Sequence, residues 1–332
     1  MTGSETVSIV VPCYNEEQTI GLLLSAIAAQ TYPRAQMEVI LADGNSSDST
    51  RERIAQFQAD HPGLNLRVID NPKRIIPAGV NLAIQAASGN IIIRLDAHSV
   101  PEPTYVERCV AGLQAGLGEN VGGLWLIEPG KAGWMAQSIA IAASHPLGAG
   151  DARYRYSTKA GEVDTVPFGA FKRSLFERIG YFDETLVTNE DYEFNTRIRA
   201  NGGKIFFDPA IRTQYFARPT LGALARQYWR YGYWKWRMLK RFPETLRWRQ
   251  ALPPIFVLGV LLLLILSIWF VPARIVLLAG LSIYAALIIA ASISHARRNK
   301  DNRLIIGIPA AITTMHFAWG SGFLWSFIHS GG

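Results

Sequence analysis

Along the first hundred positions, short continuous runs of apolar residues alternate with longer segments in which apolar residues recur at helical spacing. The short runs, rich in β-branched residues, are residues 7–11, 39–42, 66–69 and 91–95. Segments with helical spacing lie between them, at residues 16–30, 49–60 and 77–87. Ser49 followed by Glu52 predicts a capping box at the start of the second of these. The alternation predicts a parallel sheet with helices on both faces.

The pattern changes beyond position 250. Three uncharged stretches follow one another, at residues 252–273, 275–294 and 304–328. Each is long enough to supply the roughly 20 apolar residues that cross the hydrocarbon core of a bilayer. They contribute strongly to the 49% hydrophobic content of the 332-residue chain. We therefore predict a membrane region at residues 252–332 with three transmembrane helices, and the N-terminus shows no secretory signal.

A basic aromatic segment precedes the first apolar stretch. Residues 218–249 hold nine lysines and arginines against one acid, Glu244, with tryptophans and tyrosines interleaved among them. Basic and aromatic residues together are also typical of nucleic-acid binding. A position directly before an apolar stretch instead favours an interfacial helix that faces anionic lipid. We therefore expect residues 218–251 to contact membrane lipid and not nucleic acid. Residues 1–217 are expected to form a separate domain.

Charge and cysteine content indicate the compartment. The connection between the second and third apolar stretches, residues 295–303, carries four basic residues, which the positive-inside rule places in the cytosol. The same rule puts residues 1–250 in the cytosol and the C-terminus outside, in a bacterial-type inner (plasma) membrane. Two cysteines, Cys13 and Cys109, are too few for a disulfide framework and favour a reducing compartment.

Acidic residues follow three of the four predicted strands: Glu16, Asp43 and Asp96. Ligands of parallel sheets bind beyond the carboxyl ends of the strands, so we expect these acids to converge on one crevice. Each has an ordinary alternative, a first-turn helix acid for Glu16 and a turn residue for Asp43 and Asp96. Turns, however, do not require acids at three strand ends. Since no glycine-rich phosphate loop follows the first strand, we expect a metal ion to hold a phosphorylated ligand.

A metal-binding pair is predicted at the end of the fourth strand, in the sequence RLDAHS. Asp96 is followed two positions later by His98, and an imidazole among oxygen ligands suits Mn²⁺ better than Mg²⁺. The alternative is that His98 only hydrogen-bonds a turn. We predict a working site in which Asp96 and His98 hold Mn²⁺ or Mg²⁺ together with diphosphate oxygens and water.

Five motifs occur in order along the chain: VSIVVPCYNEE, LADGNSSDST, RLDAHS, TNEDYEF and QYWRY. In order and spacing they resemble those of family-2 glycosyltransferases. The segments IIPAGVNLAIQAASG and HFAWGSGF are most similar to the succinoglycan-biosynthesis glucosyltransferase branch. The resemblance implies an α/β fold of the GT-A type, a Rossmann-like nucleotide-diphospho-sugar domain, followed by a transmembrane helical region. It also implies a UDP-sugar donor.

The resemblance implies a role for each residue of the donor site. Pro12, Tyr14 and Glu16 would line the nucleoside pocket, and Asp43 would contact the uracil. Asp96 would approach the ribose and the metal, and the imidazole at position 98 would ligate the metal directly.

The resemblance assigns the catalytic base to the acidic pair Glu190 and Asp191. Asp191 would take the proton of the incoming hydroxyl, with Glu190 as the next candidate, and the like charges of NEDYE favour a raised pKa. One base without a carboxylate nucleophile implies single displacement with inversion, while a divalent cation stabilises the leaving diphosphate. The alternative for Asp191 is the N-cap of the following helix.

The acceptor side is assigned to Gly169, Gln227 and Arg230. Gly169 would let the acceptor approach the backbone closely. By the resemblance, Gln227 and Arg230 lie near the diphosphate and the acceptor, with Tyr231 where the motif usually has Trp. His316 is an ionisable residue inside an apolar stretch, equally compatible with a function and with helix packing.

These features lead to one expected function and two alternatives. We expect an inverting, membrane-anchored glycosyltransferase that moves one sugar, glucose by the resemblance, from a UDP-sugar to a polyprenyl-diphosphate-linked saccharide. The product would belong to exopolysaccharide or cell-surface glycan synthesis. A processive polysaccharide synthase would use the spans as a translocation pore, for which three are few. A catalytically inactive sugar-nucleotide-binding scaffold is disfavoured by the intact set of acids.

Overall fold

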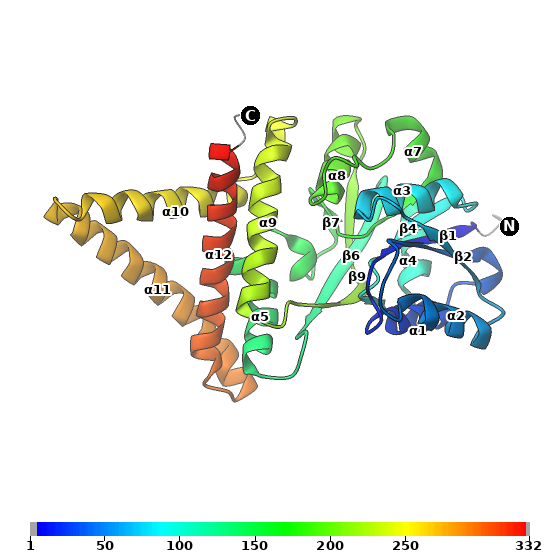
Figure 1. Ribbon diagram of the computed structural model, residues 1–332, viewed down its shortest axis with the longest axis horizontal. Helices are drawn as coiled ribbons and strands as arrows, with labels where there is room; N and C mark the ends of the chain where they lie inside the picture. The colour runs from blue at the N-terminus through cyan, green and yellow to red at the C-terminus, as the bar shows by residue number, and fades with distance from the viewer. Residues whose placement is uncertain (1–4, 330–332) are drawn as a thin grey trace. The chain divides into compact units, whose positions relative to one another are not determined.

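A computed structural model describes residues 5–329 (Figure 1). The chain forms two compact units. The first comprises the described residues up to Leu126 together with Tyr156–Tyr215, and the second comprises Ile127–Arg155 together with the described residues from Phe216 onward. The first unit is built around a sheet, whereas the buried core of the second joins helices.

The first half of the sheet is parallel, as the sequence predicts. The strands are β1 (Val7–Cys13), β2 (Met37–Asp43), β3 (Asn65–Asp70) and β4 (Ile91–Arg94). They lie in the order β3-β2-β1-β4. β1, β2 and β4 are buried along their whole length, as expected of strands covered on both faces. The covering helices are α1 (Ile20–Ala28), α2 (Thr50–Asp60) and α3 (Ile76–Ala86).

The direction of the strand order reverses between β1 and β4. The crossovers through α1 and α2 lead one way across the sheet and the crossover through α3 leads back, so α3 lies on the opposite face from α1 and α2 (Figure 1). Such a switch point is where open α/β sheets bind ligands, beyond the carboxyl ends of the strands. One local prediction is wrong: the side chain of the N-cap Ser49 makes no capping hydrogen bond, and its N–H donates to Glu17 Oε2 at 3.1 Å, so Ser49 and Glu52 form no capping box.

The second half of the sheet contains antiparallel pairings, which the apolar pattern does not predict. The strands are β5 (Ser99–Pro101), β6 (Asn120–Glu128), β7 (Gly161–Glu162), β8 (Ala170–Lys172) and β9 (Ile205–Phe216). From β4 the order continues β8-β6-β9-β5, and β7 pairs with β9. The remaining helices are α4 (Tyr105–Gln114), α7 (Arg173–Ile179) and α8 (Glu190–Ala200), with a 3₁₀ turn η1 (Arg34–Gln36) before β2.

The second unit is helical. The elements before β7 are α5 (Trp134–Ser144), α6 (Pro146–Ala149) and the 3₁₀ turn η2 (Arg153–Arg155). Those after β9 are α9 (Leu221–Leu239), η3 (Pro243–Thr245), α10 (Trp248–Leu266), α11 (Val271–Asn299) and α12 (Leu304–His329). A buried cluster joins α5, α9, α11 and α12 through Ile139, Leu224, Ile288 and Ile312. Three helices, α10, α11 and α12, are long and apolar enough to cross a membrane.

Gly123 provides a test of the packing between β6 and β9. A Cβ at this position would lie 1.8 Å from the backbone oxygen of Ile211, and backbone cannot move aside as a flexible side chain can. We expect Gly123→Ala to lower the free energy of unfolding by about 3 kcal/mol or more, the upper end of overpacking costs. The measurement is the Tm of the full-length protein in detergent.

Gly21→Ala in α1 is the matched control, because a Cβ there meets nothing within 4 Å. Alanine is the better helix former, so the Tm of this variant should be unchanged or slightly raised. Equal Tm values for the two variants would contradict the close approach of β6 to β9.

Candidate active site

The loops that follow β1 and β2 are tied together at the switch point. The parallel register pairs Cys13 with Asp43, so the two strands end at the same level. Asn15, in the left-handed region with a φ of 54°, donates its N–H to Ser46 Oγ at 2.9 Å. Its side-chain oxygen accepts the Ser47 N–H at 2.8 Å. The two loops therefore form one rim.

Asp43 lies beneath this rim and is 0% exposed. Its carboxylate accepts hydrogen bonds from the N–H and hydroxyl of Ser46 and from Arg51 Nε at 2.5 Å. Burial opposes the charge, but these hydrogen bonds outweigh it and hold the pKa of Asp43 below its ordinary value. In this structure Asp43 is thus an ionised anchor for the loop after β2. Of the other predicted nucleoside residues, Pro12 is buried in β1 and Tyr14 is 46% exposed.

Glu16 and His98 meet beyond the end of β4. His98 Nδ1 lies 3.1 Å from Glu16 Oε1, and both side chains are partly exposed. A carboxylate on Nδ1 favours the tautomer in which Nε2 carries the lone pair, which is how proteins commonly orient a metal-binding imidazole. The turn itself is closed by Ser99, whose N–H and hydroxyl both donate to the Asp96 carbonyl. The turn is therefore held without the side chains of Asp96 and His98.

Asp96 and His98 fit a metal ion that arrives with a phosphorylated ligand. Within residues 5–329, no group of three His, Cys, Asp or Glu side chains could hold a metal ion by itself. Mg²⁺-type sites, however, commonly use one or two protein ligands together with substrate phosphates and water. Asp96 is 22% exposed and His98 is 30% exposed, two positions apart at the end of a strand. This arrangement suits a site of that kind.

A buried arginine joins this edge of the sheet to α8. Arg94 is the last residue of β4, and its Nη2 lies 2.8 Å from Glu190 Oε1 and 3.4 Å from Asp96 Oδ1. The side chains of Arg94 and Glu190 are only 5% and 7% exposed, so water screens their attraction weakly. The Arg94 N–H also donates to the Gly169 carbonyl at 3.0 Å. Arg94 cannot be singled out from the sequence, because it stands inside a run that predicts a buried strand.

The acids at the start of α8 have perturbed proton affinities. Burial raises the pKa of Glu190 to about 7, with the charge of Asp191 adding to the rise and that of Arg94 opposing it. Burial also raises the pKa of Asp191, and the charge of Asp96 adds to that rise. The N-cap of α8 is Asn189, so Asp191 is a first-turn residue and not the cap. Glu190 is held by Arg94, whereas Asp191 accepts the N–H of Tyr192 at 2.7 Å.

Gly169 has a structural reason to be glycine. Its φ is 90°, and a Cβ would lie 2.3 Å from Asn120 Oδ1. Asn120 in turn donates to Asn195 Oδ1 in α8 at 2.7 Å. Close packing against Asn120 is therefore sufficient to explain why position 169 is glycine, without any contact to a saccharide acceptor.

An aromatic cluster beside His98 is absent from the sequence prediction. Trp125 in β6 and Tyr215 in β9 are stacked with ring centroids 4.1 Å apart, and the Tyr215 ring lies 6.0 Å from that of His98. Phe168 packs against Trp125 at 5.3 Å. The three side chains are buried, at 5–9% exposed, so they form apolar packing next to the candidate metal pair. They belong to parts of the chain for which the apolar pattern predicts no element.

Gln227 and Arg230 lie in the second unit, on α9. Gln227 Nε2 donates to the Tyr231 hydroxyl at 2.9 Å. Tyr231, which replaces the tryptophan usual in this motif, also packs edge-on against Tyr228 with ring centroids 5.5 Å apart. Arg230 is exposed. The tyrosine thus contacts the glutamine of its own motif.

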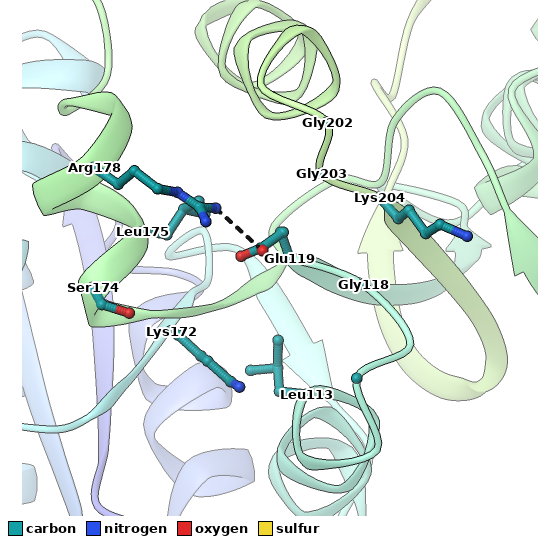
Figure 2. Close-up of a pocket in the computed structure, with 11 residues that line it drawn as sticks. Leu113, Gly118, Glu119, Lys172, Ser174, Leu175, Arg178, Gly202, Gly203 and Lys204 are labelled. Atoms are coloured by element: carbon teal, nitrogen blue, oxygen red, sulfur yellow. Dashed lines mark ion pairs between the residues drawn. The ribbon is translucent and has the colours of Figure 1, made fainter.

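A separate cavity of about 480 Å³ lies at the opposite edge of the sheet (Figure 2). Lys172 in its wall pairs in register with Ile91, the first residue of β4, whereas the candidate site lies beyond the last. Arg178 and Lys204 also line it, but Arg178 is paired with Glu119 at 3.2 Å (Figure 2). Among the described residues that line this cavity there is no predicted site residue.

A family match accompanies this geometry. The family described as "Glycosyl transferase family 2" matches residues 8–180, from β1 through α7. The matched region contains every predicted donor-site position between 12 and 98.

Individual relatives extend the similarity. The chain is 28% identical over 325 residues to the succinoglycan biosynthesis protein ExoA of Rhizobium meliloti, covering 95% of this chain and 93% of that protein. It is 27% identical over 248 residues to the dolichyl N-acetyl-alpha-D-glucosaminyl phosphate 3-beta-D-2,3-diacetamido-2,3-dideoxy-beta-D-glucuronosyltransferase of Methanococcus voltae, covering 73% and 76%. Among solved structures, the mannosyltransferase PcManGT of Pyrobaculum calidifontis, in complex with GDP-Man and Mn²⁺, superposes with a TM-score of 0.63 at 20% identity, covering 98% and 88%.

The pair of Arg94 and Glu190 yields a stability prediction. Arg94→Met leaves a buried carboxyl without its counter-charge, which typically costs about 3–5 kcal/mol. The loss should grow as pH rises from 6 to 8.5. A buried carboxyl with a raised pKa contributes most to stability below the pKa that it has in the unfolded chain. This contribution is lost progressively as the pH rises from that value to the pKa in the folded state. In the parent that loss is complete near the Glu190 pKa of about 7, whereas without Arg94 the pKa rises further and the loss continues.

The measurement is the Tm of full-length variants across this pH range. Glu190→Met introduced together with Arg94→Met should recover most of the loss, because an apolar pair can replace a buried ion pair. Arg178→Met, at a pair whose arginine side chain is 54% exposed, is the control and should change stability by no more than about 1 kcal/mol. A double variant as unstable as Arg94→Met alone would rule out the charge argument.

Proposed function

The chain belongs to glycosyl transferase family 2, and from this membership we propose that it transfers one sugar, which we take to be glucose, from a UDP-sugar to a lipid-linked saccharide with inversion. The enzyme is a glycosyltransferase with an α/β fold of the GT-A type followed by apolar helices. Its relatives act in polysaccharide or glycan biosynthesis, which supports a role in exopolysaccharide or cell-surface glycan synthesis.

The similarity to relatives supports the acceptor class. The Methanococcus relative is named for a dolichyl N-acetyl-alpha-D-glucosaminyl phosphate, a lipid-linked sugar. The Rhizobium relative is named for succinoglycan biosynthesis, and from the resemblance to that branch we propose glucose as the sugar and a polyprenyl-diphosphate-linked saccharide as the acceptor. Such an acceptor accounts for the apolar helices, because its lipid tail keeps the reacting hydroxyl close to the membrane surface.

The donor lies over the switch point in this proposal. The nucleoside packs against the rim that carries Tyr14 and Glu16, and the diphosphate extends toward Asp96 and His98. A divalent cation held by these two residues supplies a Lewis acid for the negative charge of the departing UDP. The stacked rings of Trp125 and Tyr215, beside His98, lie on the side where we place the sugar. By family resemblance we assign Gln227 and Arg230 to the diphosphate and the acceptor.

The observation that carries the proposal is the ion pair of Arg94, which holds the start of α8 beside Asp96. It brings Glu190 and Asp191 next to the candidate metal pair and occupies Glu190. Asp191 has a raised pKa, which makes it a stronger base for the hydroxyl of the acceptor. One base acting on the face opposite the leaving group gives inversion.

Membrane attachment follows from the three apolar helices. We assign residues 1–217 to the catalytic domain, 218–251 to an interfacial segment and 252–332 to the membrane region. The catalytic domain is placed on the cytosolic side of a bacterial-type inner membrane, because basic residues concentrate in 218–249 and 295–303.

Asp191→Asn is the test of the catalytic assignment. Asparagine has nearly the same shape but cannot take the acceptor proton, and loss of a general base typically costs about 10²–10⁴-fold in rate. UDP binding in the presence of Mn²⁺, measured by calorimetry, should change little. Transfer is measured by incubating the enzyme with a panel of labelled UDP-sugars and counting the labelled sugar that is extracted with the lipid.

Asp60→Asn, at an exposed acid on α2, is the matched control and should transfer at the parental rate. Parental activity in Asp191→Asn would move the base to Glu190. A ladder of products from the parent enzyme would indicate a processive synthase, and no transfer with any UDP-sugar and lipid acceptor would indicate an inactive scaffold.

The contact of Glu16 with His98 gives a graded prediction for the metal. Removal of a group that orients a ligand typically lowers metal affinity about 10–100-fold, so we expect that range for Glu16→Gln and at least as large a loss for His98→Ala. His98→Asp should retain part of the affinity, because carboxylates are good ligands for Mn²⁺ and Mg²⁺. The measurement is UDP-sugar binding as a function of Mn²⁺ concentration.

His61→Ala is the control for loss of an imidazole, since His61 stacks on Phe57 at the end of α2. Its Mn²⁺ dependence should match that of the parent. Unchanged Mn²⁺ dependence in His98→Ala would show that His98 is not a ligand.

A further inference from the structure

Helices α9 and α12 lie side by side and approach each other backbone to backbone (Figure 1). A Cβ on Gly232 of α9 would lie 2.1 Å from the Trp319 carbonyl oxygen, and one on Gly322 of α12 would lie 2.2 Å from that of Trp229. Further along, Trp236 packs against aromatic rings of α12 with centroids 4.9–5.4 Å away. Wherever α12 lies relative to a bilayer, α9 lies with it.

The outer face of α9 is basic along its length. Arg226, Arg230, Arg237 and Lys240 are exposed, and their spacing of four, seven and three residues places them on one side of the helix. A helix of 19 residues is about 28 Å long, close to the roughly 30 Å of the hydrocarbon core. If α9 stood upright in the bilayer, Arg230 would lie near the centre of the hydrocarbon core, with its charged side chain exposed to lipid. Charges at that depth normally face a bundle interior or water.

One face of the first half of α12 is buried against protein, although Ile306 on another face is 72% exposed. A Cβ on Gly307 would lie 2.1 Å from Ser138 Oγ in α5, and His316 Nε2 lies 2.8 Å from the Leu147 carbonyl oxygen in α6. Of the most apolar 18-residue window of α12, 39% is buried, against 17% for both α10 and α11. The contact with Leu147 also gives His316 a packing role.

The hairpin of α10 and α11 is different, because its apolar side chains are exposed on nearly all sides. Ile265, Ile275 and Ile283 are 54–63% exposed, and Trp269 at the tip is 70% exposed. Arg274 donates to the Ser267 carbonyl at 2.9 Å near the same tip. Tryptophan and arginine at the end of an apolar segment are typical of a membrane–water interface.

We propose that only the hairpin of α10 and α11 crosses the bilayer, and that α12 lies along α9 on the lipid surface of the side that holds the catalytic unit. The partner of the basic face of α9 is then the anionic headgroup layer of that leaflet. Two crossings return the chain to its starting side, so residue 329 lies on the same side as the catalytic unit. This departs from the outside C-terminus expected from three spans.

The experiment is site-directed cysteine labelling of the full-length protein in bacterial spheroplasts with a membrane-impermeant maleimide. Both native cysteines are buried, which keeps the background low. Cysteines are introduced by Ser267→Cys at the hairpin tip, by Asn302→Cys between α11 and α12, and by addition after Gly332. We expect the tip to react in intact spheroplasts, and the other two positions to react only after the membrane is opened.

Labelling after Gly332 in intact spheroplasts would show a third crossing and overturn the proposal. Failure of the tip to react in intact spheroplasts, with reaction after opening, would show that the hairpin does not cross. A reporter active only outside the membrane, fused after His329, provides a second measurement and should be inactive. Topology is read without a sugar donor, so these outcomes stay separate from those that test the transfer reaction.

Discussion

A buried positive charge at the end of β4 is the constraint on which the active-site geometry depends. The guanidinium of Arg94 is 5% exposed at the end of an otherwise apolar strand, and a charge removed from water is tolerated only with compensation. Glu190 and Asp96 provide it, one from α8 and one from two positions beyond the strand. The first turn of α8 is therefore held over the end of β4, a position that helix propensity alone does not specify.

In the proposed reaction, the same cluster favours a cation beside the phosphorylated donor. Three carboxylates, those of Asp96, Glu190 and Asp191, share the influence of a single guanidinium. Burial and mutual repulsion raise the pKa of Glu190 and Asp191, which is the expected response to an excess of acidic groups. Remaining negative charge next to His98 repels a bare diphosphate and attracts a cation. The residues that we propose as the base would thus also favour a metal-bound form of the donor.

How much of the fold and of the candidate site can be predicted depends on the signal that each strand and each residue leaves in the sequence. The parallel strands are β-branched runs buried on both faces, so the apolar pattern is sufficient for them. β5 and β8 have three residues each and β6 contains two adjacent glycines, so they leave no periodic signal. Asp96 and His98 stand where a predicted strand ends, so they can be proposed as a pair from the sequence. Arg94 pairs with Glu190, 96 positions away, and Trp125 stacks on a residue of a distant strand. No local sequence pattern contains such long-range contacts.

Hydropathy has a related limit at the C-terminal end, because it does not distinguish burial by lipid from burial by protein. Leu304, Ile308 and Ile312 of α12 are 0% exposed within a cluster that includes Ile139 of α5 and Leu224 of α9. These three side chains are therefore already removed from water. Entering the hydrocarbon would gain little for them and would strip water from the basic face of α9, which moves with α12. The free energy of insertion thus belongs to the packed helices together, and the composition of α12 alone does not determine it.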